Sequence, residues 1–355
     1  MLLALLGFLA VYGGTNWYIA ARLWRWLGLT SGGWLWAICF AVLATAFLFS
    51  QFETFMPLKL SKALNTVGGW YLQSYLILLL LVPAADLLTR GGPIVAAVLL
   101  LLAACVTAYG VWNARRIVRT DYTVEADIPE PLTLALISDV HLGWIIDAKQ
   151  LAPMIDAVNA ADADYVLLAG DTLDEGPDLV LDKEAAGREF ARLRAKRGIY
   201  ACLGNHDGAF KGQEDAAQQL LTRWGVRVLR DEVALDGAVA VAGRKDDAER
   251  DRMPCDQLLK EIDKEKTFTV LLDHQPGFFP EEKAAGADLI LCGHTHNGQM
   301  FPFGLATGSI YHPDYGRKTE DGCTMIVSSG IGTWGPRIRT GCHAEVAVIR
   351  LTPGK

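Results

Sequence analysis

Four long apolar runs in the first third of the chain constrain its fold more than any other feature. They cover residues 2–21, 34–50, 69–87 and 93–112, and no charge interrupts any of them before its last turn. Each is close to the roughly 20 residues that a helix needs to cross the hydrocarbon core of a bilayer. Buried helices of a soluble core are the alternative, but four such runs in succession favour a membrane region. We therefore predict a four-span transmembrane domain over residues 1–114.

Aromatic and basic residues around these runs predict an orientation. Seven of the ten tryptophans lie in or near the ends of the runs, as interfacial aromatic residues do. Four spans would put the N-terminus, the loop 51–68 and everything after the last span on one side. That side has five basic residues, which are Lys59, Lys62, Arg115, Arg116 and Arg119. The other side has three. The positive-inside rule then predicts a multi-pass protein of a bacterial-type inner membrane, with its second domain in the cytoplasm.

The first run also has to be distinguished from a signal peptide. No basic residue precedes it, and three further runs follow. We therefore expect it to be retained as a span and not cleaved.

The remainder of the chain has a different composition. Residues 121–355 contain 25 basic and 38 acidic residues, a net charge of −13. Such a balance disfavours nucleic acid as a partner, because binding to a phosphate backbone needs clustered Lys and Arg. It favours cations instead. The seven cysteines show no paired spacing, which is typical of buried free thiols in a reducing compartment.

After the last run, a polar stretch over residues 115–131 predicts a linker, and residues 132–355 predict a second domain. In that domain apolar strand-like runs alternate with helical patterns. Strands are expected at 132–138, 165–169, 199–203, 226–229, 238–243, 268–272, 288–292, 324–328 and 345–351, and helices at 149–160, 183–195, 214–224 and 255–264. Alternation of this kind predicts an α/β fold in which central sheets are flanked by helices.

Five short motifs rich in Asp, Asn and His follow these predicted strands. They are Asp139-Val140-His141, Gly170-Asp171, Gly204-Asn205-His206-Asp207, Asp273-His274 and Gly293-His294-Thr295-His296. Loops at the carboxyl ends of strands converge in α/β sheets, so separate motifs can form one cluster. In extended backbone, the first and third residues of Asp-x-His or His-x-His point the same way.

Each motif alone has an ordinary explanation. Asn and Gly favour polar turns, Asp171 or Asp174 can cap a following helix, and histidines can lie on the surface. Together, however, the motifs predict one site whose oxygen and nitrogen ligands hold two divalent metal ions.

In order and spacing, the five motifs resemble those of the calcineurin-like metallophosphoesterase superfamily, over about residues 132–350. The string Gly293-His294-Thr295-His296-Asn297-Gly298-Gln299 and the tail Ser328-Ser329-Gly330-Ile331-Gly332 leading to Arg339 narrow the resemblance. They are similar to the branch of membrane-associated phosphodiesterases that includes UDP-diacylglucosamine pyrophosphohydrolase. Members of the family often have Gly at the position of Asn297.

The resemblance implies a role for each motif. One metal ion would be held by Asp139, His141 and His296, the other by Asn205, His274 and His294, with Asp171 bridging both. Such mixed ligands suit Mn, Fe or Zn. His206 would meet the charge that develops on phosphorus or protonate the leaving oxygen, with Asp207 orienting it.

Three further polar residues are expected near the site. Asp174 and Asp273 are expected to fix histidine tautomers. Arg339 is a candidate phosphate contact, with a surface or structural role equally open.

The predicted enzyme is a membrane-bound phosphoesterase in which metal-activated hydroxide attacks a phosphodiester or pyrophosphate bond. Apolar residues after three motifs, at 144–146, 278–279 and 300–303, either pack the core or accept an acyl chain. The second reading predicts a lipid or lipid-linked nucleotide as substrate. Two alternatives remain: a membrane-anchored hydrolase of soluble nucleotides or cyclic nucleotides, and a non-catalytic metal-binding sensor or transport component.

Overall fold

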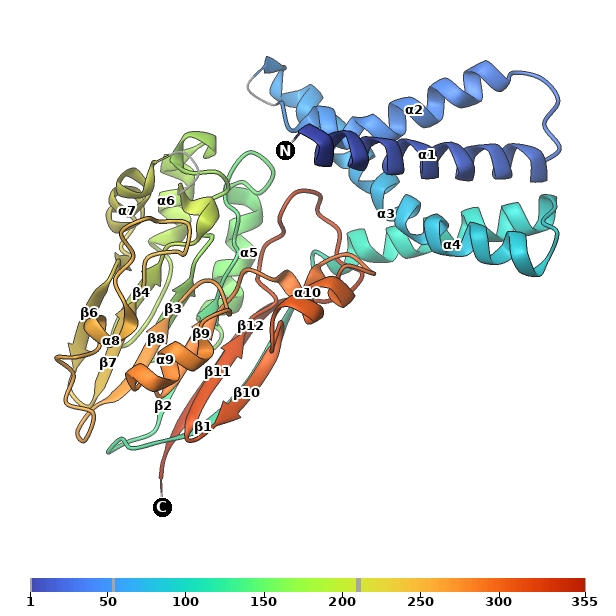
Figure 1. The fold of residues 1–355 in the computed structure, drawn as a ribbon. Coiled ribbons are helices and arrows are strands. Elements are labelled where there is room, and N and C mark those ends of the chain that lie inside the picture. The colour runs from blue at the N-terminus through green and yellow to red at the C-terminus, as the bar shows by residue number, and fades with distance from the viewer. Residues whose placement is uncertain (1, 53–54, 209–211, 355) are drawn as a thin grey trace. The chain divides into compact units, whose positions relative to one another are not determined.

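The computed structural model describes residues 2–52, 55–208 and 212–354, and these form two compact units (Figure 1). One unit comprises Met1–Asn113 together with the short segment Gly335–Thr340. The other comprises Ala114–Trp334 and Gly341–Lys355.

The first unit is built from four helices: α1 (Leu2–Trp26), α2 (Gly33–Ser50), α3 (Leu58–Leu88) and α4 (Pro93–Asn113). By length and composition alone, α2, α3 and α4 are able to cross a membrane. α1 is a fourth apolar helix, of 25 residues. α3 begins well before the predicted run, because Lys59 and Lys62 extend it with a polar first turn.

The second unit contains two six-stranded sheets. The first has the order β1-β12-β2-β3-β4-β5. Its strands are β1 (Ile117–Ala126), β2 (Leu132–Ile137), β3 (Tyr165–Ala169), β4 (Gly198–Cys202), β5 (Arg227–Val228) and β12 (Ala344–Pro353). Strands β2 to β5 are parallel, and β12 runs antiparallel to β2 and parallel to β1.

The second sheet has the order β10-β11-β9-β8-β7-β6. Its strands are β6 (Glu232–Asp236), β7 (Val239–Gly243), β8 (Phe268–Leu272), β9 (Leu289–Cys292), β10 (Gly316–Glu320) and β11 (Cys323–Val327). The four central strands, β7, β8, β9 and β11, are parallel. These four strands are covered on both faces, which explains why all their residues are buried and nearly all are apolar.

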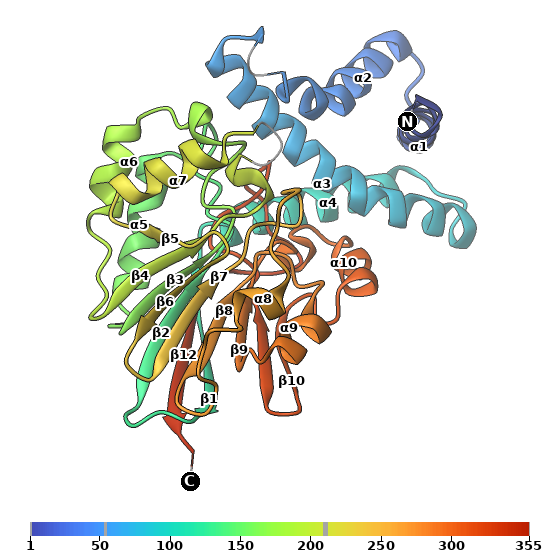
Figure 2. The same cartoon turned by 60° about the vertical axis from the view of Figure 1, so that its left-hand side comes forward.

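Three apolar clusters hold together the sheets and helices that Figure 2 draws as ribbons. The first lies between the β1–β5 sheet and the helices α5 (Ala148–Asn159), α6 (Lys183–Phe190) and α7 (Glu214–Arg223). The second lies between the two sheets, and the third joins the other sheet to α8 (Cys255–Leu258) and α9 (Phe279–Ala285). The predicted α/β architecture with flanking helices is confirmed.

Local signals in the sequence explain where these helices begin. The Asp147 carboxylate accepts a hydrogen bond from the Lys149 amide, and the Gln150 side chain accepts one from the Asp147 amide. This capping box starts α5. Leu151, Ile155 and Val158 then form the helix face that packs into the first cluster.

The predicted linker, 115–131, is wrong as a description of this segment, because it contains β1. The strand lies at a sheet edge and exposes alternate polar residues, so its sequence resembles a solvated connection. Its partner is β12, more than 200 positions away, with Ile117 opposite Ala344. Pairing of such separated segments leaves no local pattern.

Two predicted helices are shorter than expected: 183–195 ends at Phe190 and 255–264 ends at Leu258. The short elements β6, β10, α9 and α10 (Gly304–Ile310) were not predicted. They span seven residues or fewer, which is too short for a clear periodic pattern.

Candidate metal centre

All five sequence motifs lie in loops that follow the carboxyl ends of parallel strands β2, β3, β4, β8 and β9. Backbone hydrogen bonds join these loops to one another. The amides of Asp139 and His141 donate to Gly170 O and Asp171 O, each at 3.0 Å. The Gly332 amide donates to Asp139 O at 2.9 Å, which ties the predicted Gly330–Gly332 tail to the first motif.

The candidate ligands do not have the extended backbone that was expected of them. Asp139, His141, Asp171, His294 and His296 all have positive φ, between 49° and 72°. Residues with a side chain rarely adopt this left-handed region, and each costs on the order of 1–3 kcal/mol there. Tight turns, not strand geometry, therefore bring paired side chains to one point. Asn297 also has a φ of 48°, a conformation that Asn and Gly share.

Two glycines allow the loops to approach closely. A Cβ on Gly204 would lie 2.3 Å from Asp171 Oδ1, and one on Gly293 would lie 2.4 Å from Asp139 Oδ2. Any side chain at either position would displace a carboxylate that belongs to the site.

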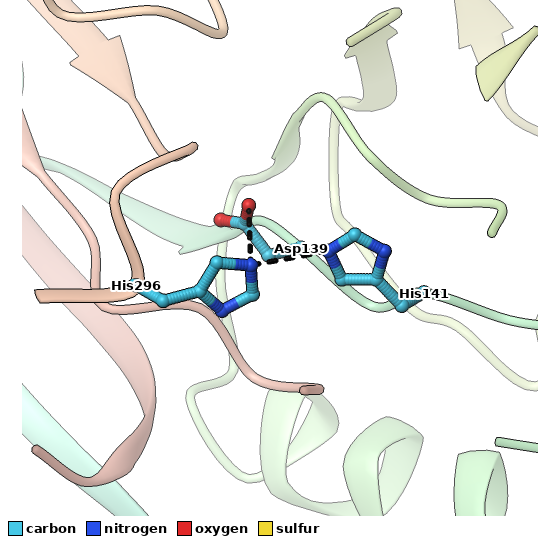
Figure 3. Close-up of side chains that lie close together, drawn as sticks. All are labelled: Asp139, His141 and His296. Carbon is cyan, nitrogen blue, oxygen red and sulfur yellow. Dashed lines mark hydrogen bonds and ion pairs between the residues drawn. The ribbon is translucent and has the colours of Figure 1, made fainter. Parts of the chain in front are cut away.

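Asp139, His141 and His296 form one group of potential ligands (Figure 3). His141 Nε2 and His296 Nε2 are 3.1 Å apart, and His296 Nε2 lies 3.4 Å from Asp139 Oδ1. All three residues are buried. Figure 3 shows both imidazoles directed toward the same point beside the carboxylate.

Asp171, His274 and His294 form a second group, joined by Asn205. His274 Nε2 lies 3.0 Å from Asp171 Oδ2 and 3.3 Å from His294 Nδ1. Asn205 Oδ1 lies 3.0 Å from the same His294 nitrogen. Asp171 also reaches the first group, since its Oδ2 is 3.9 Å from His141 Nε2. One carboxylate therefore lies between the two groups.

The nitrogen and oxygen atoms of the site are better arranged to bind divalent cations than to form hydrogen bonds with one another. His274 Nδ1 donates to Ala169 O at 2.9 Å, so it is Nε2 that faces Asp171 and His294 and that would bind a metal ion in the neutral imidazole. Imidazole nitrogens that face each other and a carboxylate need a positive charge between them. Zinc and similar ions bind such nitrogens at about 2.0–2.1 Å, which puts neighbouring ligand atoms about 3 Å apart. The observed spacings match this requirement.

Charges within the site are strongly coupled. Burial opposes ionisation of Asp171, but the neighbouring imidazoles, His274 above all, outweigh it and hold the pKa of this carboxyl below its usual range. Burial raises the pKa of Asp139. Burial and the charge of His274 together lower the pKa of His294 to about 4, so that His294 presents a neutral imidazole. Neutral imidazole is the form that binds metal.

His206 lies outside the two groups above and forms a third group of potential ligands with His141 and Asp174. Its Nδ1 lies 2.8 Å from Glu175 Oε1, and its amide donates to Asp171 Oδ1 at 2.8 Å. Burial opposes its charge, but the hydrogen bond to Glu175 and the nearby aspartates raise the pKa of His206 to about 9. The prediction that Asp207 orients His206 is wrong: Asp207 accepts from the amides of Leu173 and Gly204, so it shapes the loop.

Glu175 was missed because it falls one position beyond the Asp171-x-x-Asp174 pattern. Its φ of 60° turns it back toward His206. Only the acidic character of the loop hinted at this contact.

The two other aspartates differ. Asp174 Oδ1 lies 3.5 Å from His141 Nδ1 without forming a hydrogen bond to it, so its role in fixing the tautomer of His141 stays a prediction. Asp273 does not have the expected role, because it pairs with Arg244 and Arg252 beneath the site. The tautomer of His274 is instead fixed by a backbone carbonyl, Ala169 O.

A cavity of about 230 Å³ opens over the metal-binding side chains. One part of its wall is polar and includes Asp171, His206 and His294. The other part is formed by Met300, Phe303, Thr307 and Trp334 among others.

Of the three apolar segments predicted at the rim, only residues 300–303 line this cavity. Trp144, Ile146 and Phe279 are buried in the core, and Phe278 packs under Arg252. The position of Trp334 in the cavity wall was not predicted, because Trp334 follows the glycine-rich tail and is not part of an apolar run.

Arg339 is not among the residues that line this cavity. It belongs to the segment Gly335–Thr340, which clusters with the helical unit, and it is fully buried. Its amide donates to Gly110 O and its carbonyl accepts from Asn113, each at 3.0 Å. Of the two roles that the sequence left open, the structural one agrees with this position.

Comparison with known proteins found a family model and several relatives that match the region carrying the site. Residues 132–298 match the family model described as calcineurin-like phosphoesterase. Over 232 residues the chain is 32% identical to an uncharacterized metallophosphoesterase of Helicobacter pylori, covering 64% of this chain and 61% of that protein. A Campylobacter jejuni metallophosphoesterase is 29% identical, covering 64% and 62%.

A third relative is described by its name as a transmembrane protein that has a metallophosphoesterase domain. The Danio rerio transmembrane protein with metallophosphoesterase domain is 27% identical over 274 residues, covering 70% of this chain and 60% of that protein. The chain thus matches about three fifths of the length of each of these relatives.

Proposed function

Because residues 132–298 match the family model described as calcineurin-like phosphoesterase, we propose that the protein is a membrane-bound hydrolase that cleaves a phosphodiester or pyrophosphate bond with two divalent metal ions. The observation that carries this proposal is the position of Asp171 between two groups of imidazole and carboxylate ligands. A metal-binding sensor would not need a charged imidazole beside the ligands, as His206 is here.

The proposed division of labour follows the geometry. Asp139, His141 and His296 would hold one ion, Asn205, His274 and His294 the other, and Asp171 would contact both. Such a pair of ions, when bound, polarises the phosphoryl group and lowers the pKa of water. Manganese, iron and zinc all suit these ligands.

His206 is the proposed catalytic residue of the protein itself. It lines the cavity, and Glu175 holds its imidazole by Nδ1. A protonated imidazole at this place donates a proton to the leaving oxygen or a hydrogen bond to the phosphoryl oxygens.

The proposed substrate is a lipid or a lipid-linked nucleotide. Met300, Phe303 and Trp334 give the cavity an apolar wall beside its metal-binding end. A phosphoester with an acyl chain next to the phosphorus would fill both parts. The candidate spans would keep the enzyme beside such substrates.

The second compact unit, Ala114–Trp334 with Gly341–Lys355, is called the catalytic unit from here on. It is proposed to face the cytoplasm of a bacterial-type inner membrane. The support is the excess of basic residues on that side of the predicted spans. Protease treatment of intact spheroplasts and of inverted vesicles tests this. Cleavage of the catalytic unit in intact spheroplasts would contradict the assignment.

Phosphorus NMR tests the function most directly. Purified full-length protein with manganese is incubated with a membrane lipid extract and, separately, with a panel of nucleotides and cyclic nucleotides. New phosphate resonances are expected in the lipid extract, and not with chelator or with His206→Ala. Turnover of soluble nucleotides alone would replace the lipid substrate with a soluble one. No turnover of either set would contradict the hydrolase.

A further inference from the structure

The catalytic unit has an exposed apolar surface beside the cavity. Among its described residues, eight large apolar side chains are exposed, and six of them lie in this one region. They are Phe301, Phe303, Leu305, Ile310, Tyr315 and Trp334. We call residues 301–315 with Trp334 the apolar apron.

Most of the apron lacks the charged side chains that are typical of a water-exposed surface. Residues 301–311 contain no charged side chain, although the chain from residue 121 onward has a net charge of −13. Its helix, α10, has no buried residue, and Leu305 and Ile310 are 75% and 68% exposed. Exposed apolar groups of this extent mark a binding surface.

The apron is nevertheless firmly attached to the metal site. Thr307 Oγ1 donates to Asp314 Oδ2 at 2.7 Å, and Thr295 Oγ1 donates to Asp314 O at 2.5 Å. The Tyr311 ring meets the His294 ring edge-on at 5.7 Å. Phe303 both lines the cavity and is exposed. The surface therefore extends to the cavity wall.

The covalent path of the chain indicates what covers the apron. The apron is joined to the beginning of β12, because Tyr315 Oη donates to Glu345 Oε2. The chain just before the apron is joined to the chain just before β12, because Gly341 N donates to Gln299 O. The same end of β12 pairs with the start of β1, where Ile117 lies opposite Ala344.

Only three residues, 114–116, lie between Ile117 and the end of α4, the last candidate span. The four Cα–Cα steps from Asn113 to Ile117 span at most roughly 14 Å. The part of the catalytic unit that holds the apron is thus the part tethered at the bilayer. The intervening Arg115 and Arg116 are exposed and basic, as residues at a lipid headgroup surface are.

We propose that the apolar apron is a membrane-docking surface, which inserts its aromatic and aliphatic side chains into the headgroup region of the bilayer. Interfacial segments bind in this way when apolar side chains face the acyl boundary. Docking would hold the apolar wall of the cavity at the lipid surface. The inference does not depend on the reaction proposed above, and its test does not measure activity.

Depth-resolved fluorescence of full-length protein tests the proposal. The protein is reconstituted as one chain per nanodisc of phosphatidylethanolamine and phosphatidylglycerol, with an environment-sensitive fluorophore on a single cysteine. Cys39 and Cys105, the two exposed native cysteines, are first replaced by alanine; the other five are buried. The test positions are Leu305→Cys and Ile310→Cys.

The matched control is Leu235→Cys, which is 68% exposed on β6, at the sheet edge opposite β10. We expect blue-shifted emission at positions 305 and 310 and loss of that emission with doxyl-labelled lipids, but neither effect at position 235. Emission at all three positions like that of an aqueous label would overturn the proposal. A blue shift that lipid quenchers do not reduce would also overturn it, because a protein surface would then cover the apron.

Discussion

The helical unit and the catalytic unit differ in where their polar and apolar side chains lie, although both bury apolar residues. Inside the helices, the buried residues of α3 include Ser61, Asn65, Gly68 and Gln73, while leucines such as Leu87 point outward. In the catalytic unit three apolar clusters fill the interior, and the buried charges gather where loops meet. The difference shows that the surroundings, apolar for one unit and aqueous for the other, decide what each interior contains.

The two units also differ in how deeply they bury charged side chains. The helices hold one charged pair of note, Arg22 with Asp86 at 2.9 Å, and it is partly exposed. The catalytic unit buries Asp139 and Asp171 almost completely among imidazoles. Burying charge at that density is costly unless it is neutralised. Metal binding and hydrolysis are therefore expected to depend on side chains of the catalytic unit, and helix packing on those of the helical unit.

The largest effect is expected from Asp171→Asn. Loss of the carboxylate that contacts both ligand groups should release metal and reduce hydrolysis to background. Metal analysis and turnover of the purified variant check this. The control is Asp162→Asn, an exposed residue with a similar φ of 48°, which should change neither. Full metal content in the Asp171 variant would argue against a shared ligand.

His206→Ala is expected to reduce kcat by about 10²–10⁴-fold, the usual contribution of a general acid. Metal content should be unchanged, because His206 belongs to neither of the two groups proposed to hold the ions. His343→Ala, at an exposed position, serves as the control. Unchanged turnover would remove His206 from the mechanism, whereas loss of metal would make it a ligand.

Gly68→Leu addresses the helical unit alone. A Cβ at this position would lie 2.2 Å from the backbone nitrogen of Phe47, so α2 and α3 could not pack as they do. Overpacking of this kind costs about 1–3 kcal/mol. Thermal unfolding in detergent should shift to lower temperature, with metal content retained. Gly14→Leu, where the structure has open space, is the matched control and should leave the unfolding temperature as it was.

The smallest effect is expected from Glu175→Gln. This change keeps the shape but removes the charge that faces His206 Nδ1, and kcat should fall about tenfold, or roughly 1.4 kcal/mol. Glu184→Gln, at an exposed position in the first turn of α6, should have no effect. A loss as large as that of His206→Ala would mean that Glu175 itself contacts the substrate.

Much of this fold could be predicted, because its main signals are local. Strands such as 165–169 and 268–272 are fully buried apolar runs, and the structure has them at the expected residues. The edge strand β1 could not be recognised, since its partner β12 lies at the other end of the chain. Only the folded chain reveals that pairing.

The candidate site shows the same limit. The motifs that provide Asp139, His141 and Asp171 are visible as residue types after strands. Their left-handed backbone is not visible, nor is the pairing of His206 with Glu175 instead of Asp207. The sequence also gave no reason to put Arg339 in a segment that clusters with the helices. These features depend on where loops cross, which composition does not encode.

The count and coupling of bound metal ions test the central claim most directly. Full-length protein loaded with manganese is examined by elemental analysis and by electron paramagnetic resonance. A carboxylate shared through Asp171 predicts two ions per chain with the spectrum of an exchange-coupled pair. One ion per chain, or two with the spectrum of isolated manganese, would contradict the account.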